Sequence, residues 1–551
     1  MSEINGEKVS LKKLLSDDFF FCIPDYQRPY SWQKSHCEQL FEDIDESNRQ
    51  NEYFLGTIIL QEIGKIGTGK KYDVIDGQQR ITTLQILLAC LRDAVNDKSY
   101  KEATQKKIYQ KENLADGIPE QARLEVKEKE CFKQFIQEEN GTTIIDGFEP
   151  ANDIQQNIRQ AIVIFQDQLR EKNQDEIKAL IEHVSQRCIF IYVSTKDFDD
   201  AYRLFTIIND RGLQLRRIDI LKANNLQPSI IKKESQRAKY ASLWEAMEND
   251  LGSEDFENLL YFIRTIEIKE KAKEDLLKEY NKLIFGKQIL NKGIGFIKHV
   301  EMYKKIFQKV VLDGDVLDAD NRLRMNSIQY KNLVSIMSSQ LANEWIPPLL
   351  FYYSKFGKDY LLELLLKLEA KYVADWVIGL TPTKRILNMT SILKQIEKSN
   401  DVAALFSSDV FKYDKKRLKD ELNQDLYNKP YAKYILLKLE YLTTEHNVLR
   451  RYGSVSVEHV LPQNPKEGSN WDMDFTPKEK IKWTNKLANL VLLSKRKNSS
   501  ASNRDFIEKK EKYLKGRITD LARSQEVLSY ATWTPAILKS RQDDAIGKLI
   551  V

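Results

Sequence analysis

The sequence predicts an α+β protein that is predominantly helical, and three observations support this prediction. Short apolar runs bounded by turn residues, which are typical of strands, lie towards the two ends of the chain. The long middle section has apolar residues at helical spacing. A length of 551 residues suits several domains. We therefore expect α+β domains at 1–225 and 441–551 around an α-helical middle domain at 226–440.

The composition is that of a folded protein with a charged surface, since 42% of the residues are hydrophobic and 30% are charged. The net charge of +5 is too small to indicate nucleic-acid binding by itself, so local clusters of charge must be considered. The five cysteines form no CxxC pair, which favours reduced thiols and a cytoplasmic location. There is no apolar signal core and no run of 18 apolar residues, so we expect neither secretion nor a membrane span.

The N-terminal domain is predicted to mix strands and helices. YFLGTIILQE (53–62) and YDVID (72–76) have strand character and are separated by a hairpin-like segment. ITTLQILLACLRDAV (81–95) has helical spacing. QRCIFIYVST (186–195) is predicted to be a strand, and DAYRLFTIIND (200–210) a helix.

Three motifs in this domain place polar residues beside strands or helix starts: IPDYQRPYSWQ (23–33), YDVIDGQQRITTL (72–84) and FTIINDRGLQLRRIDILKAN (205–224). In the second, the DGQQR turn joins a strand to a helix, where unsatisfied backbone N–H groups and the helix dipole favour an anion. Gly77 allows close approach of the backbone, and the guanidinium groups of Arg28 and Arg80 match phosphate oxygens.

We therefore predict a nucleotide site, in which Asp76 suits a divalent cation or a ribose hydroxyl. The candidate residues are Arg28, Asp76, Gly77, Gln78, Gln79, Arg80, Asn209 and Arg211, supported by Asp219 and Lys222 at i, i+3 spacing. Structural alternatives stay open: Asp76 and Arg80 as an internal ion pair, Gln27, Arg28 and Tyr30 as a structural turn, and Asp219 and Lys222 as a surface or helix–helix pair. No Walker A sequence occurs, since KIGTGKK lacks the required glycine spacing.

The C-terminal domain carries a second cluster of polar residues. VSVEHVLPQNP (455–465) is predicted to be a strand that ends in a turn. LANLVLLSKRKNSSASNRDFIEKKEKYL (487–514) is predicted to be a short strand, a polar loop and a helix. His459, one of only five histidines, ends the first strand and is followed by Asn489 and Asn498.

These residue types suit phosphodiester cleavage. A neutral imidazole can activate water, a divalent cation can stabilise the leaving oxygen, and a hard cation prefers oxygen ligands such as an amide or a carboxylate. A further group must hold the imidazole in place. Glu458 is a candidate metal ligand, although strand alternation could also point it away from His459.

Basic residues surround this segment and suit a polyanionic substrate. The candidate DNA-binding residues are Lys495, Arg496, Lys497, Arg504, Lys509 and Lys510. A solvated helix face is the alternative interpretation. Asn503 could be a helix N-cap, with Ser502 as an equal candidate. Trp471 and Trp483 could stack on bases or pack in the core.

EHVLPQN and LANLVLLSKRKNSSASNRDFIEKKEKY resemble the HNH (ββα-metal) nuclease domain at the C-terminus of GmrSD-type restriction endonucleases. That resemblance implies that His459 is the general base, that Asn489 positions it or its loop, and that Asn498 and Glu458 ligate the metal. Asn498 stands where a final histidine is common in this family, and its side chain still offers an oxygen ligand. Asn503 and Lys509 match positions to which we assign supporting roles.

The three N-terminal motifs resemble the DGQQR domain of the same family, which is related to ParB and sulfiredoxin folds. The resemblance implies a modification-dependent (type IV-like) restriction endonuclease of phage defence. It would bind Mg²⁺ or Mn²⁺ at the nuclease site, bind and hydrolyse a nucleoside triphosphate in the N-terminal domain, and cleave modified phage DNA. Two alternatives stay open: a ParB-like nucleotide-switched DNA-binding protein with a degenerate nuclease fold, and a toxin-like nuclease acting on RNA or host DNA. The DNA modification, the preferred nucleotide and homo-oligomerisation are also open.

Overall fold

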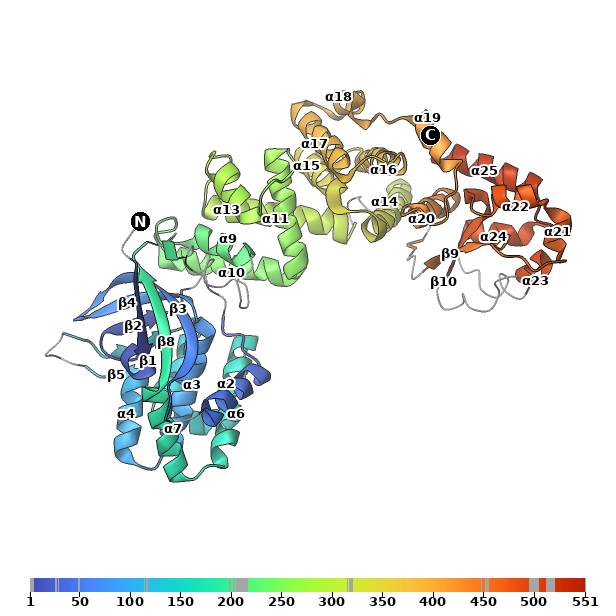
Figure 1. Ribbon diagram of the computed structural model, residues 1–551. Helices are drawn as coiled ribbons and strands as arrows, with labels where there is room; N and C mark the ends of the chain where they lie inside the picture. Colours follow the sequence, from blue (N-terminus) through green and yellow to red (C-terminus); the bar gives the residue numbers. More distant parts are fainter. Residues whose placement is uncertain are drawn as a thin grey trace. The chain divides into compact units, whose positions relative to one another are not determined.

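The computed structural model divides into two compact units, Met1–Ala246 with Lys292–Ile294, and Met247–Asn291 with Gly295–Val551 (Figure 1). It is predominantly helical with a small mixed sheet, as the sequence predicts for an α+β chain. The three domain boundaries given above stay a prediction. The structure describes residues 4–550 except 25–26, 28, 48–49, 113, 115–116, 198–199, 202–203, 205–216, 315, 317–320, 447, 451–454, 495–504 and 512–520.

The first unit contains a six-stranded mixed sheet with the order β1-β8-β3-β4-β2-β7. The strands are β1 (Asn5–Ser10), β2 (Phe19–Cys22), β3 (Tyr53–Ile66), β4 (Gly69–Asp76), β7 (Leu124–Glu125) and β8 (Cys188–Thr195). β4 pairs antiparallel with β3 and parallel with β2, and β3 pairs parallel with β8. A separate pair joins β5 (Tyr109–Gln110) and β6 (Gln121–Ala122). The predicted strands at 53–62, 72–76 and 186–195 are therefore present, and the hairpin between the first two is tighter than expected.

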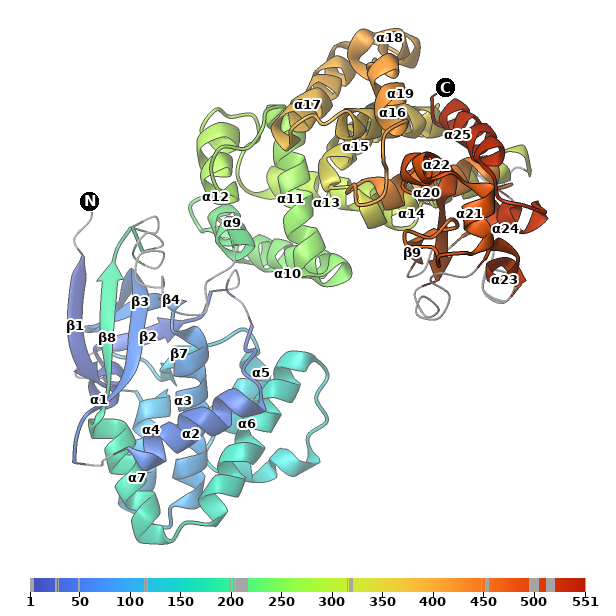
Figure 2. The same ribbon diagram turned by 45° about the vertical axis from the view of Figure 1, so that its right-hand side comes forward.

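Helices cover one face of this sheet (Figure 2). They are α1 (Leu11–Leu14), α2 (Lys34–Glu46), α3 (Gln78–Ala94), α4 (Lys98–Ile108), α5 (Lys129–Phe132), α6 (Asp153–Arg170) and α7 (Gln174–Gln186). α3 contacts α4, α6 and α7, and every residue from Ile81 to Arg92 is buried. A helix that is buried around its whole circumference belongs in a core, so α3 is the central element of this unit. α9 (Arg217–Leu226) and α10 (Glu234–Leu251) follow, while the helix predicted at 200–210 lies largely outside the described residues.

The second unit begins with the helical section that the periodicity predicts. Its helices are α11 (Ser253–Ile268), α12 (Leu276–Glu279), α13 (Ile294–Phe307), α14 (Asn321–Gln340), α15 (Ile346–Phe356), α16 (Leu361–Val377), α17 (Pro382–Lys398), α18 (Val402–Phe406), α19 (Lys415–Leu422) and α20 (Ala432–Thr443). The prolines mark helix starts. Pro382 follows Thr381, whose side chain accepts a hydrogen bond from Lys384 N and so caps α17.

The chain then forms an antiparallel pair of strands, β9 (Val455–His459) and β10 (Leu490–Ser494), in which Leu490 lies opposite His459. Short helices surround the pair: α21 (Asn470–Asp474), α22 (Pro477–Trp483), α23 (Phe506–Lys509), α24 (Ala522–Ser529) and α25 (Pro535–Leu549). Trp471 and Trp483 are buried in the hydrophobic core, so in this arrangement they pack in the core and are not available to stack on bases.

Within the described part of the chain, no helix is both long enough and apolar enough to cross a membrane. The five cysteines form no disulfide with one another, and four of them (Cys37, Cys90, Cys131 and Cys188) are buried. Burial raises the pKa of the Cys188 thiol to about 12, so this thiol stays protonated at neutral pH.

Candidate nuclease and nucleotide sites

His459 ends β9, and its side chain is enclosed by protein with only 6% of its surface exposed. Its Nε2 lies 3.1 Å from Oδ1 of Asn485, and the ring of Tyr427 packs on the imidazole with centroids 4.1 Å apart. Burial lowers the pKa of His459 below its ordinary value, the positive charge of Lys509 lowers it further, and the hydrogen bond to Asn485 opposes them. The imidazole is therefore neutral near pH 7, as a general base must be.

Asn489, just before β10, is completely buried and uses all four of its side-chain hydrogen-bonding positions. Its Oδ1 accepts from Leu461 N (2.7 Å) and from Trp533 Nε1 (3.1 Å). Its Nδ2 donates to Leu461 O (2.9 Å) and Thr484 O (2.8 Å). The amide thus holds the loop that follows His459, and in this arrangement Asn489 is a positioning residue with no bonding position left for a metal or a water.

Lys509, on α23, is also used inside the protein. Its side chain is fully buried, its Nζ donates to the backbone oxygen of His459, and the same Nζ lies 3.6 Å from Oε1 of Glu458. Burial lowers the pKa of Lys509 and raises the pKa of Glu458, while their mutual attraction opposes both shifts. This placement favours the supporting role predicted for Lys509 over the predicted contact with DNA, because a buried ammonium cannot reach a phosphate.

Of the two predicted metal ligands, Glu458 is described and Asn498 lies outside the described residues. The Glu458 carboxylate has the oxygen chemistry that a hard cation prefers, but its Oε1 is paired with Lys509. In the described ranges, no three His, Cys, Asp or Glu side chains are arranged to hold a metal ion. The described donors therefore do not complete a metal site by themselves.

The remaining predicted residues of the basic segment, Lys495, Arg496, Lys497, Asn503 and Arg504, also lie outside the described residues. Lys510 is described: it is half-buried, and its Nζ donates to the backbone oxygen of Tyr530 at 3.0 Å.

In the first unit, the DGQQR turn has the predicted form. β4 ends at Asp76, Gly77 caps the helix, and α3 begins at Gln78. Gly77 has a φ of +88°, and a Cβ there would lie 2.4 Å from Cγ2 of Ile58. Both the backbone conformation and the lack of space therefore require glycine at this turn.

The structure brings the first motif against this turn. The Gln79 side chain accepts from Ser31 N (2.8 Å) and donates to Pro29 O (3.0 Å). Gln27 Nε2 donates to Ile75 O at 3.1 Å, and the buried Tyr30 hydroxyl lies 2.9 Å from Oγ1 of Thr83. Gln27 and Tyr30 thus fit the structural-turn alternative. The Gln79 amide is likewise engaged with backbone groups, while Arg28 lies outside the described residues.

Arg80 lies against β3, with its Nη1 at 3.5 Å from Thr57 O. A Cβ at Gly56 would lie 2.6 Å from this Nη1, so a side chain at position 56 would displace the guanidinium from its present place. Burial lowers the pKa of Arg80, and the negative charge of Asp76 opposes the shift. The glycine within the YFLGT strand is the sequence signal for this close approach, and Gly56 was not among the residues predicted for the site.

Asp219 and Lys222 are both buried on α9. Lys222 Nζ pairs with Oε1 of Glu245 on α10 at 2.9 Å, and Lys127 approaches the same carboxylate at 2.8 Å. Lys222 thus takes part in a helix–helix pair, with Glu245 as its partner. Asn209 and Arg211 lie outside the described residues.

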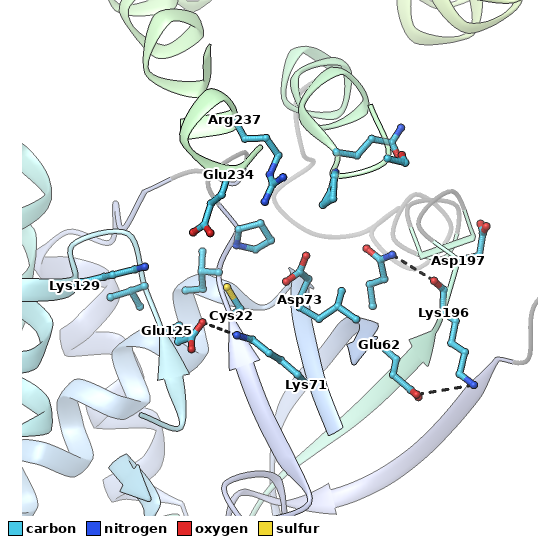
Figure 3. A pocket seen from close by; sticks show the side chains of 18 residues that line it. Cys22, Glu62, Lys71, Asp73, Glu125, Lys129, Lys196, Asp197, Glu234 and Arg237 are labelled. Carbon is cyan, nitrogen blue, oxygen red and sulfur yellow. Dashed lines mark hydrogen bonds and ion pairs between the residues drawn. The ribbon is translucent and has the colours of Figure 1, made fainter. Parts of the chain in front are cut away.

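A cavity of about 870 Å³ is lined by residues of β2, β3, β4 and β7, and Figure 3 shows the side chains around it. Its floor is a polar row across four strands, since Asp73 is in register with both Gln61 and Cys22, and Cys22 with Glu125. Figure 3 shows the α10 side chains reaching towards the cavity from the side away from these strands. This cavity could not be predicted from the sequence, because its lining comes from segments far apart in the chain.

Two family models match the chain. The model described as GmrSD restriction endonuclease, N-terminal domain, matches residues 11–226. The model described as GmrSD restriction endonucleases, C-terminal domain, matches residues 409–547, so it includes Tyr427 as well as His459. No curated protein matches the chain. Both domains of one family occur in order and together cover more than half of the sequence, so the chain belongs to the GmrSD-type restriction endonuclease family.

Proposed function

We propose that this member of a DNA endonuclease family is a nucleotide-regulated, modification-dependent restriction endonuclease acting in phage defence, with His459 as the general base of DNA cleavage. The observation that carries the proposal is the geometry at the end of β9. A buried imidazole whose pKa lies below its ordinary value is held by Asn485 and Tyr427, inside the segment matched by the family's C-terminal domain.

In the proposed reaction, neutral His459 takes a proton from the water that attacks phosphorus, and the bond from phosphorus to the leaving oxygen breaks. Lys509 holds the backbone at His459 through its carbonyl, and Asn489 holds the backbone just after it through Leu461. A Mg²⁺ or Mn²⁺ ion bound by Asn498, with Glu458 as a further ligand, would polarise the phosphate and stabilise the leaving oxygen. The other predicted basic residues, Lys495, Arg496, Lys497, Arg504 and Lys510, would contact the DNA backbone.

In the N-terminal domain we propose binding and hydrolysis of a nucleoside triphosphate at the DGQQR turn. The start of α3 supports this proposal, since the helix begins directly after β4 at Gly77, a residue with no side chain of its own to cap the first helical N–H groups. Arg80 supplies a guanidinium near Asp76, and Arg28, Asn209 and Arg211 are proposed as further contacts. Nucleotide binding would control the nuclease, because an unregulated nuclease would attack the DNA of its own cell.

The test compares the wild-type protein with His459→Ala and with a matched control, His299→Ala. His299 is a half-buried histidine of the same unit that pairs with Glu267. Each protein is first shown to be folded by circular dichroism. It is then incubated with modified phage DNA and with unmodified plasmid, with Mg²⁺, Mn²⁺ or EDTA, and with or without nucleoside triphosphates.

We expect cleavage by wild type and His299→Ala, loss of cleavage in His459→Ala, and dependence on metal, nucleotide and DNA modification. Cleavage by folded His459→Ala at the wild-type rate would refute the assigned base. Metal-independent, nucleotide-dependent DNA binding without any cleavage would instead support the DNA-binding switch, and cleavage of RNA or unmodified DNA would support the toxin-like alternative.

A further inference from the structure

Two side chains outside the predicted site residues, Asn485 and Tyr427, contact the imidazole of His459. Asn485 lies in the turn between α22 and β10 and presents its carbonyl oxygen to Nε2 at 3.1 Å. Tyr427 lies between α19 and α20, and its ring packs on the imidazole at an interplanar angle of 57°. One neighbour therefore bonds a ring nitrogen and the other limits rotation of the ring.

The Asn485 carbonyl oxygen can only accept a hydrogen bond, so the nitrogen facing it must carry the proton. A neutral imidazole has one protonated and one unprotonated nitrogen, which makes Nδ1 the basic one. We propose that Asn485 fixes neutral His459 as the Nε2–H tautomer, so that Nδ1 takes the proton from the attacking water, and that Tyr427 holds the plane of the ring. This inference rests on the role of His459 proposed above, and it makes Asn485 and Tyr427 positioning residues for DNA cleavage.

The two positioning residues are tied to each other through the backbone. The backbone oxygen of Asn485 accepts from Leu426 N (2.8 Å) and from Tyr427 N (3.2 Å). Next to it, Lys486 Nζ donates to the backbone oxygen of Asn423 at 2.7 Å. The segment that carries Tyr427 is thus fastened to the turn that carries Asn485, so both side chains keep their places relative to His459.

Other residues fix the main chain at His459. Asn489 bonds both backbone groups of Leu461, and Lys509 donates to the backbone oxygen of His459 itself. The strand end therefore stays in position when the Asn485 side chain is removed, and only the ring loses its partner. This separation makes ring orientation testable independently of the fold.

Loss of a hydrogen bond that orients a functional histidine commonly costs about 10- to 100-fold in activity. We expect Asn485→Ala to lower kcat for DNA cleavage by about 10- to 100-fold with KM changed less than about twofold, because the substrate contacts are untouched. Asn485→Asp keeps an acceptor oxygen at the same place and is expected to recover most of the lost kcat. Tyr427→Phe keeps the ring and should cleave like wild type, whereas Tyr427→Ala should lose kcat.

The experiment measures cleavage kinetics of the full-length chain under the conditions in which wild type is active. Asn423→Ala is the matched control. It removes an exposed asparagine side chain whose one described hydrogen bond is donated to the backbone oxygen of Lys419. His459→Ala is included in the same series. Melting temperatures of all variants show whether each protein is folded.

The results distinguish the role of Asn485 in orienting the ring from the role of His459 as the general base. Loss of kcat in Asn485→Ala with recovery in Asn485→Asp supports the inference. Wild-type kcat in Asn485→Ala, together with an inactive His459→Ala, overturns it and leaves the general base in place. Cleavage by His459→Ala at the wild-type rate overturns both.

A second measurement reads the tautomer in the wild-type protein itself. In the wild-type protein labelled with ¹⁵N-histidine, the His459 signals, assigned by their absence from His459→Ala, report which ring nitrogen carries hydrogen. At a pH where the ring is neutral we expect a protonated Nε2 and an unprotonated Nδ1. The opposite tautomer would overturn the inference.

Discussion

Replacing Asn489 by alanine would remove four hydrogen bonds from the interior of the C-terminal domain. The partners left without a bond would be both backbone groups of Leu461, the oxygen of Thr484 and Nε1 of Trp533. Each such bond contributes about 0.5–1.5 kcal/mol net, so four of them correspond to about 2–6 kcal/mol of unfolding free energy. That range is large for one substitution, because most point mutations cost less than about 3 kcal/mol.

Urea denaturation followed by tryptophan fluorescence would measure the loss. Trp471, Trp483 and Trp533 are buried in the core of this domain and report its unfolding. Asn464→Ala is the matched control, since Asn464 is exposed on the loop after β9, and its removal should cost no more than about 0.5 kcal/mol. Equal midpoints for Asn489→Ala and Asn464→Ala would refute the reasoning that the buried amide holds the loop after His459.

Two further substitutions test the first unit. Gly77→Ala should destabilise the first unit by more than about 2 kcal/mol and abolish nucleotide binding, because the new Cβ would clash with Ile58 and because alanine is strained at the positive φ of this position. An unchanged denaturation midpoint and unchanged nucleotide binding in a titration would contradict this prediction. Burial alone would raise the pKa of Glu245, but the charges of Lys222 and Lys127 lower this pKa below its ordinary value of 4.5. The ionised Glu245 side chain should therefore stabilise the folded protein above pH 4.5, and this stabilisation should be lost as the pH falls through the lowered pKa. The stability difference between wild type and Glu245→Gln should therefore shrink over that acid range in denaturation series, and a constant difference would speak against the buried pairing.

Local patterns were sufficient to predict several elements of this protein. Strand-like alternation in YDVID followed by Gly77 and a helical pattern predicted the β4–α3 turn, because all three signals lie in consecutive residues. The scarcity of histidine drew attention to His459, and the structure places it at the end of β9 as expected. Gly56 carried a weaker local signal, since an isolated glycine within a strand indicates close approach of another group.

The partners of these residues could not be predicted in the same way. Tyr427 precedes His459 by a stretch that includes α20, and its ring reaches the imidazole only because the chain folds back after that helix. Lys222 was paired with Asp219 by spacing along one helix, whereas the described ion pair is with Glu245 on the next helix. The polar row beneath the cavity of the first unit joins residues from four strands.

The sequence by itself determined which segments are strands and helices, where glycine is required, and which family the chain resembles, because these properties depend on residues that are neighbours in the chain. Tertiary structure alone decided which side chains hold His459, that Lys509 is buried, and that Trp471 and Trp483 belong to the core. The physical reason is that periodicity reports which face of an element is apolar, whereas the identity of the neighbour that covers this face depends on long-range packing.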